Sequence, residues 1–157
     1  TKVAFVSKFT GNQEIYTTNL VHSKTSRVTN LRNTSHSPRW NQDGTRLTFI
    51  TSAMTGFPEI YSTNGIGNPR GVVTNVRGAL GAASSGPDGR LAFASSNRNN
   101  MDVYVASADG SGARVVVATP DIDADPSWSP DGTRIASGSN DGCVIVWDAA
   151  TGDQVCA

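Results

Sequence analysis

Three aspartates at alternate positions, Asp121, Asp123 and Asp125, form the pattern in this chain that is closest to a metal site. Carboxylate oxygens are ligands that Ca²⁺ takes in proteins, so three of them in alternation could hold one ion. An EF-hand loop would need Gly at its sixth position and Glu at its twelfth, where this chain has Pro126 and Gly132. We therefore predict no metal and expect the aspartates to begin turns in a loop between structural units, with a calcium site as the alternative.

The two histidines, His22 and His36, lie fourteen positions apart and have no histidine or cysteine partner at the spacing of a zinc site. We predict that both lie in loops or at the surface and take no part in metal binding or proton transfer. The two cysteines, Cys143 and Cys156, are too few for a disulfide scaffold. We expect them to be an unbonded pair of small apolar side chains.

The sequence also lacks a recognisable catalytic motif. Residues 81–86 (GAASSG) have the wrong spacing for the Gly-x-Ser-x-Gly turn of hydrolases, and no phosphate-binding loop or dinucleotide fingerprint is present. Glu14 and Glu59 are the only glutamates, and they occupy equivalent positions 45 residues apart, which is a poor basis for paired-carboxylate catalysis. We therefore predict that the protein is not an enzyme and needs no cofactor.

A repeat of 44 residues determines where these side chains are placed. Apolar residues recur in equal steps at positions 3, 47, 91 and 135, and Ala or Thr follows each of them. Trp40 and Trp128 lie 88 residues apart, which is two periods, with Ser84 midway. A fixed period of this length indicates a repeat architecture, because each unit must bury its apolar face against the next one.

Each repeat reads as a set of short β-strands. An Asp-Gly turn lies at 43–44, 88–89 and 131–132, and the run that follows it, such as 46–51, is rich in β-branched and aromatic residues. A third run at 59–64 and a fourth, as at 113–118, complete four strands. No window has sustained helical periodicity, so we expect no helix longer than one turn.

Four short antiparallel strands in about 44 residues are typical of a β-propeller blade. The chain is therefore predicted to be all-β and to form one propeller or half-propeller domain over residues 1–157. We place its blades at about 1–33, 34–77, 78–120 and 121–157. The first blade would be incomplete, because the chain begins in what would be its second strand, Lys2–Ser7.

The repeats carry a family resemblance. Residues 126–136 (PSWSPDGTRIA), with 59–61 (EIY) and 102–104 (DVY), resemble the repeat of TolB-type propellers. The last repeat, with 135–142 (IASGSNDG) and 144–148 (VIVWD), resembles a WD40 repeat. Propellers of both types commonly act as interaction scaffolds, so the resemblance implies a binding role without catalysis.

In WD40 blades a His, a Ser or Thr, an Asp and a Trp form a buried, hydrogen-bonded set. The resemblance places Ser137, Asp141 and Trp147 in three of these positions. The Gly-His pair expected upstream is absent, and Ala124-Asp125 occupies that region, so the resemblance implies an incomplete set.

Aromatic residues follow the same period along the strands. Such rings could form a stacking surface for sugars or bases, but equivalent strand positions are typical of the packing between adjacent blades. We therefore assign these residues to the core: Phe5, Phe49, Phe93, Tyr16, Tyr61, Tyr104, Trp40, Trp128 and Trp147.

Composition and charge limit the classes of partner. No stretch contains the roughly 20 apolar residues of a membrane span, and the formal net charge is +0, so we expect neither membrane insertion nor nucleic-acid binding. The neutral total hides an asymmetry between the two halves of the chain. Residues 1–80 carry nine Lys and Arg residues and three acidic residues, whereas residues 81–157 carry four Lys and Arg residues and ten acidic residues. Opposite charge at the two ends favours specific association.

These observations favour a non-catalytic β-propeller scaffold that binds a protein or peptide and associates with itself. The simplest assembly is a homodimer in which two four-blade arrays close one eight-bladed ring. The alternatives are a channel-centred lyase or hydrolase, the gating propeller of a larger peptidase, and a fragment or engineered hybrid with no evolved ligand. The sequence predicts a soluble protein and leaves the periplasm and the cytoplasm equally open.

Overall fold

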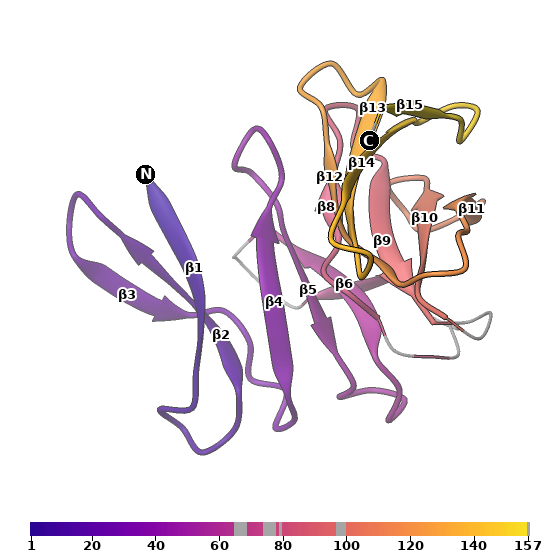
Figure 1. Ribbon diagram of the computed structural model, residues 1–157. Helices are drawn as coiled ribbons and strands as arrows, with labels where there is room; N and C mark the ends of the chain where they lie inside the picture. Colours follow the sequence, from indigo (N-terminus) through magenta and orange to yellow (C-terminus); the bar gives the residue numbers. More distant parts are fainter. Residues whose placement is uncertain (65–68, 74–77, 79, 97–99, 157) are drawn as a thin grey trace.

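All regular structure in the described part of the chain is β-structure, arranged as four antiparallel sheets (Figure 1). The computed structural model describes residues 1–64, 69–73, 78, 80–96 and 100–156. None of these residues forms a helix of the length and apolar character needed to cross a membrane.

The sheets follow one another along the chain, and each is built from consecutive strands. The first sheet comprises β1 (Lys2–Ser7), β2 (Glu14–Asn19) and β3 (Lys24–Arg27). The second comprises β4 (Ser35–Trp40), β5 (Leu47–Thr51), β6 (Glu59–Thr63) and β7 (Arg70–Val73). The third comprises β8 (Ser84–Ser85), β9 (Leu91–Ser95), β10 (Asp102–Ala106) and β11 (Arg114–Val117). The fourth comprises β12 (Asp123–Trp128), β13 (Arg134–Ser139), β14 (Val144–Asp148) and β15 (Gln154–Cys156).

This architecture confirms the prediction of β-propeller blades with an incomplete first blade. The first sheet has three strands and each of the others has four, in the order in which they occur along the chain. The described residues contain no α-helix, as the absence of helical periodicity predicted.

Asp-Gly turns connect the first two strands of the four-stranded sheets. In the fourth sheet, the Asp131 carboxylate accepts hydrogen bonds from the backbone N–H (3.0 Å) and the hydroxyl (2.8 Å) of Thr133. Gly132 follows with a φ of +72°, a conformation that residues with a Cβ rarely adopt. The Asp therefore fixes the turn through its hydrogen bonds, and the Gly provides the conformation that the turn requires.

Neighbouring sheets are held together by apolar clusters, one at each interface. Each Val, Leu, Ile or Phe side chain that is fully buried in this way contributes about 1.5–3 kcal/mol. The cluster between the first and second sheets contains Ile15, Leu47, Phe49 and Tyr61. The cluster between the second and third contains Ile50, Ile60, Val73, Leu80, Ala83, Leu91, Phe93 and Ala106. The cluster between the third and fourth contains Ala92, Val103, Val105, Val116, Val117, Trp128, Ile135, Ile145, Trp147 and Ala149.

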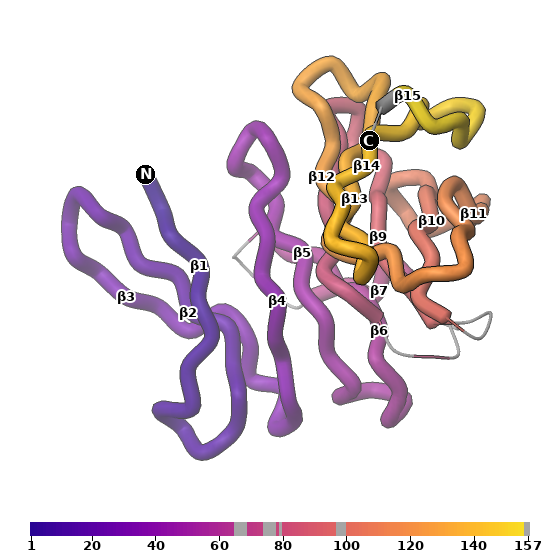
Figure 2. The backbone as a smooth tube through the Cα atoms, viewed as in Figure 1, coloured from indigo at the N-terminus to yellow at the C-terminus, as the bar shows by residue number. Residues whose placement is uncertain are grey.

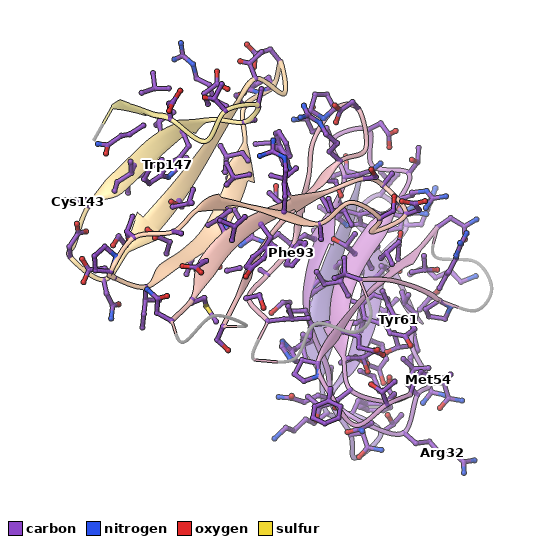
Figure 3. All side chains as sticks on the ribbon, turned by 90° about the vertical axis from the view of Figure 1, so that its right-hand side faces the viewer. Arg32, Met54, Tyr61, Phe93, Cys143 and Trp147 are labelled. Atoms are coloured by element: carbon purple, nitrogen blue, oxygen red, sulfur yellow. The ribbon has the colours of Figure 1, made fainter. Side chains whose placement is uncertain are left out.

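The assignment of the periodic aromatic residues to the core is largely confirmed. Phe49 and Phe93 are fully buried, and each lies next to a tyrosine of the adjacent strand, with ring centres 5.6–6.1 Å apart. Trp128 and Trp147 are also buried. Phe5 is only half-buried, as are Tyr104 and Trp40. Figure 3 shows Phe93 and Tyr61 inside the array, whereas Met54 and Arg32 lie at its rim.

The four sheets form an open row. The tube in Figure 2 runs from the first sheet at one end to the third and fourth sheets at the other. The first strands of the later sheets converge, because β8 contacts both β4 and β12. Arg39 of β4 also approaches Asp125 of β12, with a nitrogen–oxygen distance of 3.7 Å.

The two end sheets differ from the inner ones in how their faces are covered. Every residue of β5, β6 and β9 is buried, so both faces of the second and third sheets are covered. In the fourth sheet buried and more exposed residues alternate along β14, where Ile145 and Trp147 are buried and Val144 is 65% exposed. Because successive side chains of a strand point to opposite faces, one face of this sheet is uncovered.

Candidate functional site

The three aspartates of the predicted loop have different environments. Asp121 and Asp125 are exposed, whereas Asp123 is fully buried and accepts a hydrogen bond at Oδ2 from the hydroxyl of Thr119 (2.7 Å). Asp123 and Asp125 are part of strand β12, not of a loop, so that part of the prediction is wrong.

An irregularity in β12 explains why the alternation of the aspartates does not bring them together. The pairing of β12 with β13 shifts between Ala124 and Ser127, and Asp125 adopts a positive φ of 49°. Such a bulge changes the side to which a side chain points. The described residues contain no group of three or more His, Cys, Asp or Glu arranged to hold a metal ion. That these aspartates bind no calcium stays a prediction.

The histidines and cysteines are also separated. His22 is exposed, and His36 is half-buried in β4 with its Nδ1 3.0 Å from the hydroxyl oxygen of Ser37. Burial lowers the pKa of His36 below its ordinary value. Cys143 is an exposed free thiol in the turn between β13 and β14, at the end of the fourth sheet labelled in Figure 3. Cys156 ends β15, where its backbone pairs with Val146, and its side chain lies outside the described part of the chain.

The WD40-like set is present in part. The indole N–H of Trp147 donates a hydrogen bond to the hydroxyl of Ser137 (2.9 Å), and both residues are buried. Asp141 does not join them. It is exposed and its carboxylate accepts the backbone N–H of Cys143 (2.8 Å), which fixes the turn between β13 and β14.

The interface between the third and fourth sheets contains a tryptophan site. The guanidinium of Arg90 lies 4.7 Å from the centre of the Trp128 ring, a distance typical of a cation–π contact. Trp128 donates its indole N–H to the carbonyl oxygen of Ser84 (3.2 Å). A Cβ added to Gly86 would lie 3.1 Å from the ring, so the glycine allows the indole to approach the turn closely. Arg90 also donates to the carbonyl oxygen of Gly132 (2.9 Å).

The residue equivalent to Trp128 in the third sheet is Ser85, not Ser84. Trp128 pairs with Ile135, Trp40 pairs with Leu47, and Ser85 pairs with Leu91. Five residues lie between Ser85 and its partner Leu91, whereas six lie between each tryptophan and its own partner, so an equal spacing of 44 residues points to the wrong serine. The third sheet therefore has a small hydroxyl side chain where its neighbours have a tryptophan.

An open groove lies between the second and third sheets, next to Ser85. Its volume is about 1030 Å³, and it is lined by the turns that follow β4 and β8 and by the turn between β10 and β11. Arg46 and Arg70 supply positive charge, and Leu91 and Val72 supply apolar surface. Sequence reasoning missed this groove. The one available signal was the serine that interrupts the tryptophan spacing.

The carboxylates that line the groove are engaged within their own turns. Asp43 accepts hydrogen bonds from the hydroxyl and backbone N–H of Thr45, which lower its pKa, and Arg46 adds a smaller electrostatic effect in the same direction. Asp109 is held in the same way by Ser111, with a smaller effect from Arg70. The two arginines thus have acidic neighbours, but no hydrogen bond joins either guanidinium to another described residue.

The repeats are similar in sequence to those of known proteins. The family described as "WD domain, G-beta repeat" matches residues 121–148. The Tol-Pal system protein TolB of Anaeromyxobacter dehalogenans (strain 2CP-C) is 35% identical over 129 residues, which are 82% of this chain and 29% of that protein. The chain thus spans less than a third of the length of the curated relatives that it matches.

Solved structures share the fold. The structure of a putative TolB from Agrobacterium tumefaciens has a TM-score of 0.84 and 21% identity, covering 99% of this chain and 60% of that one. A puromycin hydrolase has a TM-score of 0.69 and 16% identity, covering 92% of this chain and 26% of that one. The strand order, the apolar interfaces and the similarity to TolB sequences lead to one assignment. The chain is built from TolB-type β-propeller repeats, with a WD40-like repeat at its C-terminal end.

Proposed function

We propose that the protein is a non-catalytic β-propeller scaffold that binds protein or peptide partners and associates with a second copy of itself. The observation that carries this proposal is the presence of one uncovered face on each end sheet, with opposite charge on the two sheets. Residues 1–33 carry five Lys and Arg residues and one acidic residue, whereas residues 121–157 carry one arginine and seven acidic residues.

The uncovered face of the first sheet carries an aromatic pair. Ala4 packs toward the second sheet, so the next residue, Phe5, points to the opposite side. Phe5 stacks on Tyr16 with ring centres 5.9 Å apart, and Val3 shares this face and is 43% exposed. At the other interfaces the equivalent rings, such as Phe93, pack against the preceding sheet.

The uncovered face of the fourth sheet has a suitable shape for such a pair. Gly138 pairs with Val144, and Ala136 pairs with Val146, on the side turned away from the third sheet. In the second sheet, the equivalent pair of Ile50 and Ile60 packs against Phe93. The smaller side chains of the fourth sheet leave room for the Phe5–Tyr16 pair of another copy.

Two such contacts, related by a two-fold axis, would join two arrays into one closed ring without free ends. The apolar contact would provide most of the affinity, because salt screens exposed charges over about 8–10 Å. The opposite charges of the end sheets would favour this head-to-tail pairing over contacts between like ends.

Two variants that each add one positive charge test the interface. Val144→Lys places a cation on the uncovered face of the fourth sheet, opposite the basic first sheet of the second copy, and should shift the mass toward the monomer. Met54→Lys changes a residue that is 69% exposed in the loop between β5 and β6, away from both end faces, and should leave the mass unchanged. Sedimentation velocity measures both. Equal masses for the two variants and the parent would contradict the proposed interface.

A further inference from the structure

Three loops at one end of the first two sheets form a continuous surface, which we call the loop surface. They are the β1–β2 loop (8–13), the β3–β4 connection (28–34) and the β5–β6 loop (52–58). The backbone N–H of Ser35, just after the connection, donates to the carbonyl oxygen of Gln13 (2.8 Å). The side-chain amide of Asn33 donates to the carbonyl oxygen of Ser52 (3.4 Å). The three loops therefore lie side by side, at the lower end of the first two sheets in Figure 1.

Large apolar side chains project from the loop surface. Phe9 is 89% exposed, Met54 is 69% exposed and Phe57 is 63% exposed. Figure 3 shows Met54 at the same end of the array as Arg32. Single exposed apolar residues are common on proteins, but three of them on adjacent loops form a patch that is typical of an interaction site.

Ordered turns present these side chains at convex loop ends. The backbone N–H of Gly11 donates to the carbonyl oxygen of Lys8 (2.8 Å), and that of Gly56 donates to the carbonyl oxygen of Ser52 (3.0 Å). Both glycines have positive φ, which such tight turns require. Apart from its chain neighbours, nothing lies within 4 Å of a Cβ added to either glycine, so both loop ends project freely.

The loop surface carries positive charge only. It contains Lys8 and Arg32 and no Asp or Glu. Both cations are exposed, and neither forms an ion pair with another residue in the described part of the chain. The glutamates that directly follow two of the loops, Glu14 and Glu59, are at most 3% exposed, so their charges are not presented at this surface.

The exposed carboxylates of the first three sheets lie at the opposite end. They belong to the β4–β5, β8–β9 and β10–β11 turns, which line the open groove: Asp43, Asp88 and Asp109. At the end that bears the loop surface, exposed aspartates occur only beside the fourth sheet, as Asp121 and Asp141, among the described residues. The basic, apolar surface is therefore confined to the first two sheets.

From this arrangement we infer that the loop surface docks on an anionic phospholipid bilayer. Phe9, Met54 and Phe57 enter the headgroup region, and Lys8 and Arg32 contact lipid phosphates. The inference goes beyond the proposed scaffold function and does not depend on it. It revises our expectation that the chain does not enter a membrane, which rested on the absence of a spanning apolar run.

A bilayer fits this surface better than a folded partner does. Separate convex ends can each enter a fluid headgroup layer, whereas a protein partner would need a matching pocket for every side chain. Cations beside the inserted side chains are attracted to anionic headgroups, and the loops carry no carboxylate that would be repelled. Apolar insertion and charge attraction thus act at the same place.

Flotation with lipid vesicles tests the inference. The 157-residue protein is mixed with phosphatidylcholine vesicles that contain phosphatidylglycerol as about 30% of the lipid, or with phosphatidylcholine alone. Half of the protein should float with the anionic vesicles at a lipid concentration on the order of 1 mM. Neutral vesicles should bind several-fold more weakly, and so should anionic vesicles in high salt.

Matched variants locate the contact. The double variant Phe9→Ser and Phe57→Ser should weaken binding about tenfold, through lost apolar insertion. The control is Leu20→Ser with Val21→Ser, which changes two exposed apolar residues in the β2–β3 turn at the opposite end and should leave binding unchanged.

A second matched pair tests the charge. Lys8→Gln should weaken binding to anionic vesicles about fivefold, the loss expected for one cation near such a surface. Lys24→Gln, at the opposite end of the first sheet, should leave binding unchanged. Because all these side chains are exposed, equal melting temperatures of the variants and the parent should show that folding is unaffected.

A fluorescent reporter distinguishes insertion from adsorption by charge alone. Phe9→Trp should shift its emission to shorter wavelength with anionic vesicles and be quenched by lipids with brominated acyl chains. Leu20→Trp should show neither effect. Vesicle binding without these changes in Phe9→Trp would overturn the inference, because the protein would then only adsorb to the headgroups.

Three further outcomes would overturn the inference. One is no flotation with anionic vesicles at a lipid concentration of about 10 mM. Another is flotation that the Phe9→Ser and Phe57→Ser variant retains in full. The third is equal loss in this variant and in the Leu20→Ser and Val21→Ser control. Self-association through the end sheets is measured as mass without lipid, so the two proposals can fail independently.

Discussion

Trp147 and Ser137 form a buried hydrogen bond between adjacent strands of the fourth sheet, with 2.9 Å between Nε1 and the hydroxyl oxygen. Ser137→Ala removes the acceptor and leaves the indole N–H buried without a partner, which should cost about 1–3 kcal/mol of unfolding free energy. Urea unfolding of Ser137→Ala, Trp147→Phe and the double variant measures the coupling. Additive losses would mean that the hydrogen bond contributes nothing to stability.

Phe93 illustrates how much of the fold depends on the periodic rings. It is fully buried between the second and third sheets, so Phe93→Ala should cost about 3–5 kcal/mol through lost burial and the cavity left behind. Phe57 is 63% exposed, and Phe57→Ala should change the stability by no more than about 0.5 kcal/mol. Melting temperatures that fall equally in both variants would contradict the observed burial.

Gly110 and Gly112 lie in the same turn between β10 and β11 but have different surroundings. Both have positive φ, so an alanine at either position should cost about 1–2 kcal/mol of backbone strain. A Cβ at Gly110 would also lie 1.5 Å from the carbonyl oxygen of Val72 in the second sheet, whereas nothing lies within 4 Å at Gly112. Gly110→Ala should therefore lower the melting temperature well beyond Gly112→Ala. A similar fall in both would indicate that this turn does not contact β7.

The stabilisation of the folded protein by the ionised Asp131 carboxylate should be lost at low pH. The hydroxyl of Ser129, and then the backbone N–H and hydroxyl of Thr133, lower its pKa from 3.8 to about 2. Since the folded-state pKa is lowered, this stabilisation is complete above pH 3.8 and is lost as the pH falls toward 2. The advantage in melting temperature of the parent over Asp131→Asn should therefore shrink between pH 4 and pH 2. A carboxyl carbon signal that titrates at 3.8 would contradict this.

The sequence predicted the fold because a propeller blade repeats its signals at fixed intervals. The steps between Leu47, Leu91 and Ile135 locate one strand of each sheet, and Asp-Gly turns mark where those strands begin. The arrangement within the sites could not be predicted in the same way. The bulge at Asp125 separates three aspartates that alternate in sequence, and the shorter turn before Arg90 moves the tryptophan position from Ser84 to Ser85.

The groove between the second and third sheets also could not be predicted from the spacing of residues alone. A missing ring at position 85 can be read from the sequence only if the register is known to one residue, and spacing alone does not give that. Asp141 likewise matches the WD40 pattern, but it is exposed and its carboxylate accepts the backbone N–H of Cys143 within its own turn, apart from the buried Ser137–Trp147 pair.

The molecular mass in solution tests the central claim most directly, because the uncovered end faces either associate or do not. Multi-angle light scattering across a dilution series measures the mass of the 157-residue chain, which is 16.4 kDa as a monomer. The account predicts a mass near twice this value at high protein concentration, falling on dilution and decreasing only modestly when salt is added, since apolar packing provides most of the affinity. A mass of 16.4 kDa that is independent of concentration would contradict it.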